Sequence, residues 1–336
     1  MLLLPPARRR PRRVAARAAT AVLGVVAAAV LVVGLIGALA LALLGGRGGI
    51  APGPGAGVGG AGPAAAGDGS ARASPDTAAD LLLRTGAAGP PAPDPPVDGA
   101  AVLAAVDTAA RAAGGSIALA VVGADGRPLV TGPTAGEAVY TASLVKLLVV
   151  GRLLDLEATG AVTLSDRDRT LMERAIVRSD DPAMSLLWDR WDGAALVTAT
   201  AAEAGLTGTA LPAVAGQWGE ATTTAADVAT LLARRDAVLG PGPAATLVSW
   251  MQATSPTAAD GFGQGFGLLA GDRAATVAAK QGWMCCAAGT RQLHTAGVLP
   301  GGQVAVLLGD FPVGTSWSRA RTALDDAAAA VRAAVG

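Results

Sequence analysis

The chain has 336 residues, of which 51% are hydrophobic, 15% charged and 3% aromatic. Two cysteines and one histidine exclude a disulfide framework, a four-cysteine zinc site and a multi-histidine metal centre. The 26 basic and 26 acidic residues balance, so net charge gives no support for nucleic-acid binding. The sequence predicts neither a metal nor an organic cofactor.

The first 46 residues have the pattern of a membrane anchor. Residues 1–17 carry six arginines and no acid, and residues 18–46 form an uncharged run rich in alanine, valine and leucine. A transmembrane helix needs about 20 apolar residues. The arginines predict a cytoplasmic N-terminus and an extracytoplasmic remainder of a single-pass membrane protein. The alternative is a signal peptide cleaved near Ala38-Leu39-Ala40; a lipobox is excluded because this region has no cysteine.

The rest of the chain divides into a linker and one domain. Residues 47–97 are rich in glycine, alanine and proline, and are predicted to be disordered because they cannot bury a core. In residues 98–336, strands are predicted at 116–122, 129–130, 275–283, 292–299 and 303–310. Helices are predicted at 100–113, 143–158, 166–177, 183–191, 193–204, 224–234, 244–253 and 316–335. This order predicts an α/β (α+β) fold with an antiparallel five-stranded sheet, flanking helices and an inserted all-helical lobe.

The chain contains only two lysines, Lys146 and Lys280, among its 26 basic residues. A lysine kept against this bias is expected to do what arginine cannot, such as losing its proton. Ser143 lies one helical turn before Lys146, so the two side chains share a face. A neutral amine there can take the serine proton and activate a nucleophile. The alternative is a helix cap followed by a surface lysine.

Two further motifs complete a recognisable set. Ser179-Asp180-Asp181 lies between predicted helices, and Lys280-Gln281-Gly282-Trp283 ends a predicted strand. The order Ser-x-x-Lys, Ser-Asp-Asp, Lys-x-Gly resembles the signatures S-x-x-K, S-D-N and K-T-G of the class A β-lactamases and penicillin-binding serine hydrolases. The resemblance covers about residues 98–336, and residues 140–148 are similar to the actinobacterial membrane-anchored branch.

The resemblance implies a role for each matching residue. Ser143 would be the acylated nucleophile, and Lys146 the general base or part of a proton relay. Ser179 would pass a proton to the leaving group, and Lys280 would hold the substrate carboxylate and polarise Ser179. The backbone N–H groups of Ser143 and Trp283 would form an oxyanion hole.

The predicted substrate-binding surface, formed by Asp181, Gln281, Gly282 and Trp283, departs from the family pattern at two positions. Asp181 stands in place of asparagine, and an ionised carboxylate accepts hydrogen bonds but cannot donate them. Its charge would also favour the charged forms of the two lysines. Gln281 replaces a serine or threonine hydroxyl that helps to hold a carboxylate.

A third departure concerns deacylation. Class A β-lactamases use a loop glutamate to activate the deacylating water, but residues 206–221 form a short loop whose only carboxylate is Glu220. We therefore predict an acyl hydrolase of the D,D-peptidase or penicillin-binding type, acting on peptidoglycan peptides or β-lactams and deacylating β-lactams slowly. The alternatives are a class A-type β-lactamase relying on Glu220 and a catalytically weak pseudoenzyme that binds wall peptides.

Several single residues permit more than one interpretation. Tyr140 packs beside the site or takes part in catalysis, and His294 is a packed residue or a Ser-His base. Trp218 lines a pocket rim or packs within its loop. Cys285 and Cys286 form a strained disulfide, or are small apolar residues or a dimer contact.

Overall fold

The computed structural model describes residues 96–271 and 276–335. A five-stranded sheet lies at the centre of this region, with the strands in the order β2-β1-β7-β6-β5 and every neighbouring pair antiparallel. The strands are β1 (Ser116–Val122), β2 (Pro128–Thr131), β5 (Ala278–Cys285), β6 (Thr290–Val298) and β7 (Val304–Pro312). The predicted antiparallel sheet is therefore confirmed.

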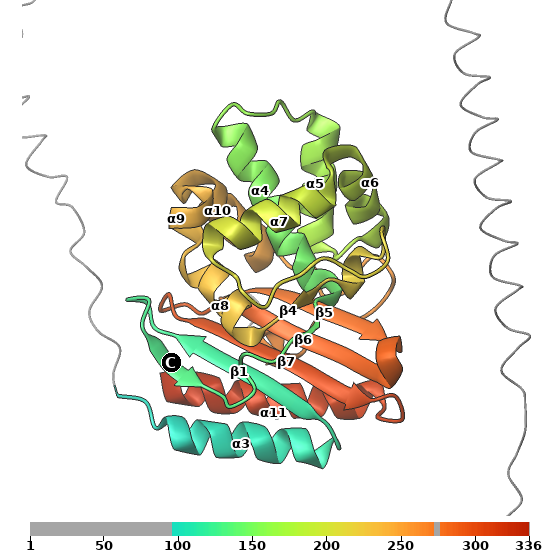
Figure 1. Ribbon diagram of the computed structural model, residues 1–336. Coiled ribbons are helices and arrows are strands. Elements are labelled where there is room, and N and C mark those ends of the chain that lie inside the picture. The colour runs from blue at the N-terminus through green and yellow to red at the C-terminus, as the bar shows by residue number, and fades with distance from the viewer. Residues whose placement is uncertain (1–95, 272–275, 336) are drawn as a thin grey trace, which may run out of the picture. The chain divides into compact units, whose positions relative to one another are not determined.

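Two helices from the ends of the described region cover one face of the sheet. These are α3 (Gly99–Ala112) and α11 (Trp317–Val335), which pack against each other beneath the strands (Figure 1). Helix α3 begins after Asp98, whose carboxylate accepts a 3.0 Å hydrogen bond from the Ala101 N–H. Buried alanines, valines and leucines from both helices and the sheet form a hydrophobic cluster on this face.

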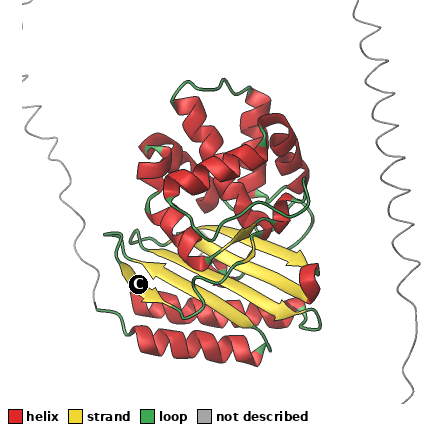
Figure 2. Ribbon diagram, viewed as in Figure 1, coloured by secondary structure: helices red, strands yellow, loops and turns green. Residues whose placement is uncertain are grey.

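The helices between β2 and β5 gather on the opposite face of the sheet (Figure 2). They are α4 (Val145–Ala158), α5 (Asp166–Val177), α6 (Asp181–Trp191), α7 (Gly193–Ala204), α8 (Ala225–Ala233), α9 (Arg235–Leu239) and α10 (Pro241–Gln252). Helix α8 packs on β1 and β7, and α10 packs on β5. A second hydrophobic cluster joins these helices to the sheet. The inserted helical lobe is thus confirmed.

Polar capping residues fix several helix starts. Ser165 and Asp168 form a reciprocal capping box at the start of α5, and the Thr224 side chain accepts from the Asp227 N–H at the start of α8. Each cap satisfies backbone donors that a helix leaves without partners at its first turn. The helices predicted at 166–177 and 224–234 begin within one residue of these observed starts.

The structure also contains short elements that the sequence analysis does not predict. Strands β3 (Val139–Tyr140) and β4 (Thr222–Thr223) pair as a two-stranded sheet, and α9 is a separate five-residue helix. Such short elements show too little periodicity to be recognised. The predicted helix at 143–158 begins as a 3-10 turn, η1 (Ala142–Leu144), before α4. Further 3-10 turns are η2 (Trp218–Glu220), η3 (Gly267–Leu269) and η5 (Ala287–Gly289).

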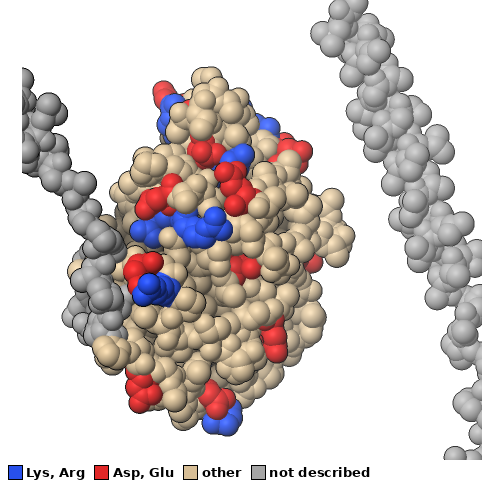
Figure 3. All heavy atoms as spheres, turned by 60° about the vertical axis from the view of Figure 1, so that its left-hand side comes forward, with Lys and Arg blue, Asp and Glu red and all other residues tan. Residues whose placement is uncertain are grey.

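The predicted basic segment of residues 1–17, the anchor of residues 18–46 and the linker up to residue 95 lie outside the described residues. Among the residues that are described, no helix combines the length and the apolar character needed to cross a membrane. On the face drawn in Figure 3, acidic and basic side chains are interspersed over the helical lobe. That face therefore lacks the broad basic patch expected of a nucleic-acid-binding surface.

Candidate active site

Ser143 lies in the middle of η1, directly before α4, and its side chain is buried. The preceding residue, Ala142, has a φ of 45°, in the left-handed region that residues other than glycine rarely adopt. Lys146 follows in the first turn of α4, and its Nζ donates a 3.0 Å hydrogen bond to the Ser143 Oγ. The Ser-x-x-Lys spacing thus brings the amine and the hydroxyl together.

Lys146 is fully buried and surrounded by acceptors. Besides Ser143, its Nζ donates to the Ser179 carbonyl oxygen at 2.7 Å and to the Asp181 Oδ1 at 2.6 Å. Burial lowers the pKa of Lys146, and the charge and hydrogen bond of Asp181 oppose this effect. Burial therefore makes it easier for Lys146 to lose its proton, and Asp181 makes it harder.

Ser179 connects the two lysines. Its Oγ accepts a 2.7 Å hydrogen bond from the Lys280 Nζ and lies 3.4 Å from the Lys146 Nζ. Lys280 is also fully buried, and burial together with the charge of Lys146 places its pKa well below the usual value. The backbone of Ser179 has a φ of 49°, so a second left-handed residue lies at this site. Ser143, Lys146, Ser179 and Lys280 form one hydrogen-bonded group.

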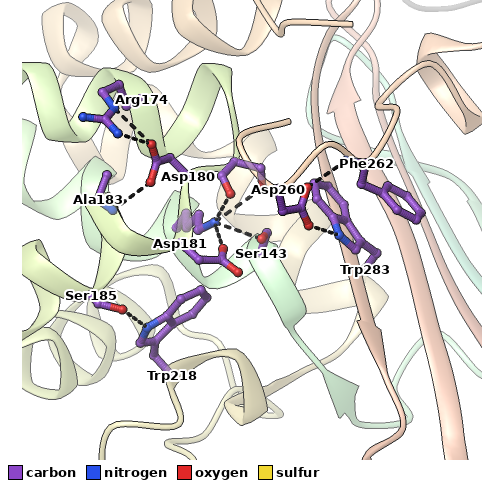
Figure 4. Close-up of polar contacts among 12 residues, drawn as sticks. Ser143, Arg174, Asp180, Asp181, Ala183, Ser185, Trp218, Asp260, Phe262 and Trp283 are labelled. Atoms are coloured by element: carbon purple, nitrogen blue, oxygen red, sulfur yellow. Dashed lines mark hydrogen bonds and ion pairs between the residues drawn. The ribbon is translucent and has the colours of Figure 1, made fainter. Parts of the chain in front are cut away.

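Asp180 fixes the turn that carries Ser179 and Asp181. Its carboxylate accepts from the Ala183 N–H at 2.9 Å, which caps α6, and from the Arg174 guanidinium of α5 at 3.0 and 2.5 Å (Figure 4). Burial alone would raise the pKa of Asp180, but these hydrogen bonds lower it overall. Asp180 was predicted only as part of its motif, and its partner Arg174, on α5 before that motif, was not predicted.

Gly282 allows β5 to approach η1 closely. A Cβ at this position would lie 3.2 Å from the Thr141 carbonyl oxygen and 3.4 Å from the Leu144 Cγ. These distances are at or below ordinary van der Waals contact, so a side chain would push the strand away. The glycine of the Lys-x-Gly motif therefore keeps Lys280 and Trp283 beside the Ser143 turn.

A cavity of about 330 Å³ opens beside Ser143. Its walls come from η1, the start of α6, the end of β5 and the loop that includes η2. They are formed by Ala142, Ser143, Asp181, Ser185, Gly216, Gln217, Trp218, Gly219, Glu220, Trp283 and Met284. The structure thus places Asp181, Glu220 and Trp283 on one cavity with Ser143. Trp218 also lines it, and its Nε1 donates to the Ser185 Oγ at 3.2 Å.

Gln281 does not join this group. Neighbouring residues of a strand point to opposite faces, and the Gln281 side chain points away from Lys280 and from the cavity. Its amide donates to the carbonyl oxygens of Gln264 at 3.0 Å and Phe266 at 2.6 Å. The sequence analysis places Gln281 at the substrate-binding surface, whereas the structure buries it completely.

Tyr140 and His294 contact each other behind the site. The His294 Nε2 lies 2.9 Å from the Tyr140 carbonyl oxygen, and neither residue lines the cavity at Ser143. Burial lowers the pKa of His294 to about 4, so the imidazole is neutral at pH 7. This geometry favours the interpretation of His294 as a packed residue and gives Tyr140 a contact through its backbone.

The remaining candidate ligands do not form a metal site. Within residues 96–271 and 276–335, no three histidine, cysteine, aspartate or glutamate side chains are grouped to hold a metal ion. Cys285 and Cys286, at the end of β5, are joined in a disulfide. Trp283 donates through its Nε1 to the Asp260 Oδ2 at 3.1 Å and stacks on Phe262.

The five-stranded sheet with its helical insert has a β-lactamase-like fold. Residues 167–309 match the model of the β-lactamase enzyme family. Solved structures agree in fold: a β-lactamase from Sphaerobacter thermophilus has a TM-score of 0.56 and 17% identity, covering 71% of this chain and 98% of that one. PBP-A has a TM-score of 0.57 and 20% identity, covering 72% and 98%. The family resemblance stated from the motifs is confirmed.

Curated relatives match a smaller part of the chain. The protein described as "Putative lipoprotein LppW" from Mycobacterium tuberculosis is 37% identical over 184 residues, which are 53% of this chain and 57% of the relative. Its counterpart from Mycobacterium bovis gives the same values. The chain thus matches little more than half the length of these relatives.

Proposed function

We propose that this protein is a serine acyl hydrolase that acts outside the cytoplasm through an acyl-enzyme on Ser143. The observation that carries the proposal is the buried hydrogen-bonded group of Ser143, Lys146, Ser179 and Lys280 at the edge of a cavity. A nucleophile, a base and a proton donor for the leaving group are the parts that acyl transfer requires.

The reaction proceeds in two halves. Neutral Lys146 takes the proton of Ser143 while the Ser143 Oγ attacks the carbonyl carbon, and the N–H groups of Ser143 and Trp283 stabilise the oxyanion. Lys146 returns this proton through the Ser179 hydroxyl to the leaving nitrogen, the bond from carbon to nitrogen breaks, and an ester remains on Ser143. Water then hydrolyses the ester and restores the hydroxyl.

The substrate class that we propose is a peptidoglycan peptide or a β-lactam, with Lys280 polarising Ser179 through its hydrogen bond. The β-lactamase family match and the structural likeness to PBP-A support this class. Deacylation of β-lactams is expected to be slow because the loop of residues 206–221 supplies only Glu220 as a base.

The proposed location is the outer side of the membrane. The apolar run of residues 18–46 supports an anchor, and the name of the relative, a lipoprotein, supports attachment to a membrane. Because Cys285 and Cys286 are the only cysteines, the proposed anchor is the helix and not a lipid on an N-terminal cysteine.

Labelling with a fluorescent penicillin tests the nucleophile. We expect covalent labelling of the wild type and none of Ser143→Ala, because the ester needs the Ser143 Oγ. Ser249→Ala is the control, since Ser249 is an exposed serine of α10 that does not line the cavity, and it should keep the label. An unlabelled wild type would favour the catalytically weak wall-binding alternative, and a labelled Ser143→Ala would place the nucleophile elsewhere.

A class A-type β-lactamase is the second candidate, favoured by the position of Glu220 on the cavity wall. Turnover of a chromogenic cephalosporin separates the two candidates. We expect slow turnover that Glu220→Gln leaves unchanged, because in this proposal Glu220 does not activate the deacylating water that limits turnover. Rapid turnover that Glu220→Gln abolishes would show that Glu220 activates the deacylating water, and the β-lactamase would be the correct assignment.

A further inference from the structure

The cavity beside Ser143 carries charge of one sign on its walls. Of the described residues that line it, two are acidic, Asp181 and Glu220, and none is basic. The Asp181 side chain is 58% exposed, so its carboxylate faces solvent in the cavity as well as Lys146. Only one of its oxygens, Oδ1, is engaged with that lysine. A ligand in the cavity therefore meets acceptors and negative charge.

The two lysines do not offset this charge at the wall. Both side chains are fully buried, and their ammonium groups are directed at partners within the protein. Lys146 Nζ has close acceptors in Ser143, Ser179 and Asp181, which match the three donors of an ammonium group. Lys280 donates to Ser179 and to the Gln281 carbonyl oxygen. Neither lysine lines the cavity.

Two tryptophans also line the cavity. The Trp218 ring centroid lies 5.1 Å from the Lys146 Nζ, and its Nε1 is held by Ser185. Trp283 is fixed on the other side, stacked on Phe262 with ring centroids 4.7 Å apart. Figure 4 shows Asp181, Trp218 and Trp283 around Ser143.

We infer that Asp181 is a specificity-determining residue that selects acyl donors carrying an ammonium group near the reactive carbonyl. The ammonium donates to the Asp181 carboxylate, with Glu220 and the Trp218 ring also on the cavity wall. A donor with a carboxylate at the same place is disfavoured by both acids. The inference rests on the proposed function, in which Ser143 is the acyl acceptor.

Three penicillins that differ only in the charge on one side-chain carbon test the selection. They are ampicillin with an ammonium group, benzylpenicillin with hydrogen and carbenicillin with a carboxylate. We expect the second-order acylation rate of the wild type to fall in that order, with a ratio of ampicillin to benzylpenicillin of about five, as for one partly exposed charge-assisted hydrogen bond. Added salt should reduce the ratio because it screens partly exposed charges.

Two variants assign the selection to its residues. In Asp181→Asn the ratio of ampicillin to benzylpenicillin should fall to about one, whatever the absolute rate becomes. In Glu220→Gln it should fall only in part. Non-covalent binding of the three penicillins to Ser143→Ala should follow the same order, which tests the selection without the reaction.

The outcomes separate the inference from the proposed function. Equal or reversed preference in a wild type that is acylated overturns the inference and leaves the function intact. A preference that survives in Asp181→Asn overturns the assignment to Asp181. If no penicillin acylates the wild type, the proposed function fails. The order in which Ser143→Ala binds the three penicillins then tests whether the cavity prefers cations. An absent or reversed order would contradict that preference as well.

Discussion

At the scale of single residues, the site depends on two opposing influences on Lys146. Burial lowers the pKa of this lysine, and the Asp181 carboxylate at 2.6 Å raises it. The base in acylation is the neutral amine, so acylation becomes faster as the pH rises through the pKa of Lys146. Asp181 thus raises the pH at which Lys146 becomes a neutral base. Its carboxylate also holds the Lys146 Nζ beside Ser143.

The substitution Asp181→Asn should move this rising limb to lower pH. The asparagine keeps a hydrogen-bonding oxygen near Lys146 but removes the negative charge, so the ammonium form loses stabilisation. The measurement is the acylation rate with benzylpenicillin as a function of pH. Asp189→Asn, an exposed acid on the same helix α6, is the control and should leave the limb in place. A limb that stays fixed or moves to higher pH in Asp181→Asn would contradict this account.

At the scale of elements, the site depends on the contact between β5 and the η1 turn. Gly282 favours this contact, because a Cβ there would lie 3.2 Å from the Thr141 carbonyl oxygen and 3.4 Å from the Leu144 Cγ, so that its neighbours would have to shift. Lys280, which is bonded to Ser179, precedes Gly282 on β5, and Trp283 with its backbone N–H follows it. A small displacement of β5 therefore moves two proposed catalytic groups relative to Ser143.

We expect Gly282→Ala to lower the acylation rate by about tenfold, since small misplacements of reacting groups have effects of this size or larger. Gly136→Ala is the matched control, because a Cβ at Gly136 meets no atom within 4 Å. Rates with benzylpenicillin and urea unfolding curves should be measured for both variants. A Gly282→Ala variant that acylates like the wild type would show that the close approach is not needed.

At the scale of the whole molecule, a neutral histidine in the sheet links folding to pH. His294 is fully buried on β6, and burial lowers its pKa to about 4 from the model-peptide value near 6.5. Between these values the unfolded chain binds a proton that the folded chain does not. The contribution of His294 to stability is therefore complete above pH 6.5 and is lost as the pH falls toward 4.

This loss should amount to as much as about 3 kcal/mol in the free energy of unfolding. His294→Gln keeps an amide donor for the Tyr140 carbonyl oxygen but does not titrate in this range. Urea unfolding at pH 7 and pH 4 measures the difference for both proteins. The variant should lose less stability than the wild type between pH 7 and pH 4. An equal loss in the two proteins would contradict the assignment of this pH dependence to His294.

Much of the site could be predicted because its chemistry is encoded in local motifs. The scarcity of lysine and the spacing of Ser143 to Lys146 indicate an amine beside a hydroxyl, and the structure places the two atoms 3.0 Å apart. Ser179 and Lys280 were added by resemblance to family motifs. The long strands and helices followed from hydrophobic periodicity and polar caps.

The parts that were missed depend on contacts between distant residues. Arg174 reaches Asp180 from another helix, and Trp218 reaches Ser185 from a loop 33 residues away. The direction of the Gln281 side chain depends on the register of β5, which a motif does not specify. These features become visible only when the chain is folded.

In the proposed mechanism, Lys146 activates Ser143 to form an acyl-enzyme. The most direct test is the intact mass of the protein after incubation with benzylpenicillin, followed by peptide mapping. We expect one added penicilloyl group, located on Ser143, and no added mass in Lys146→Met. An unchanged wild-type mass, or a penicilloyl group on any other residue, would contradict the account.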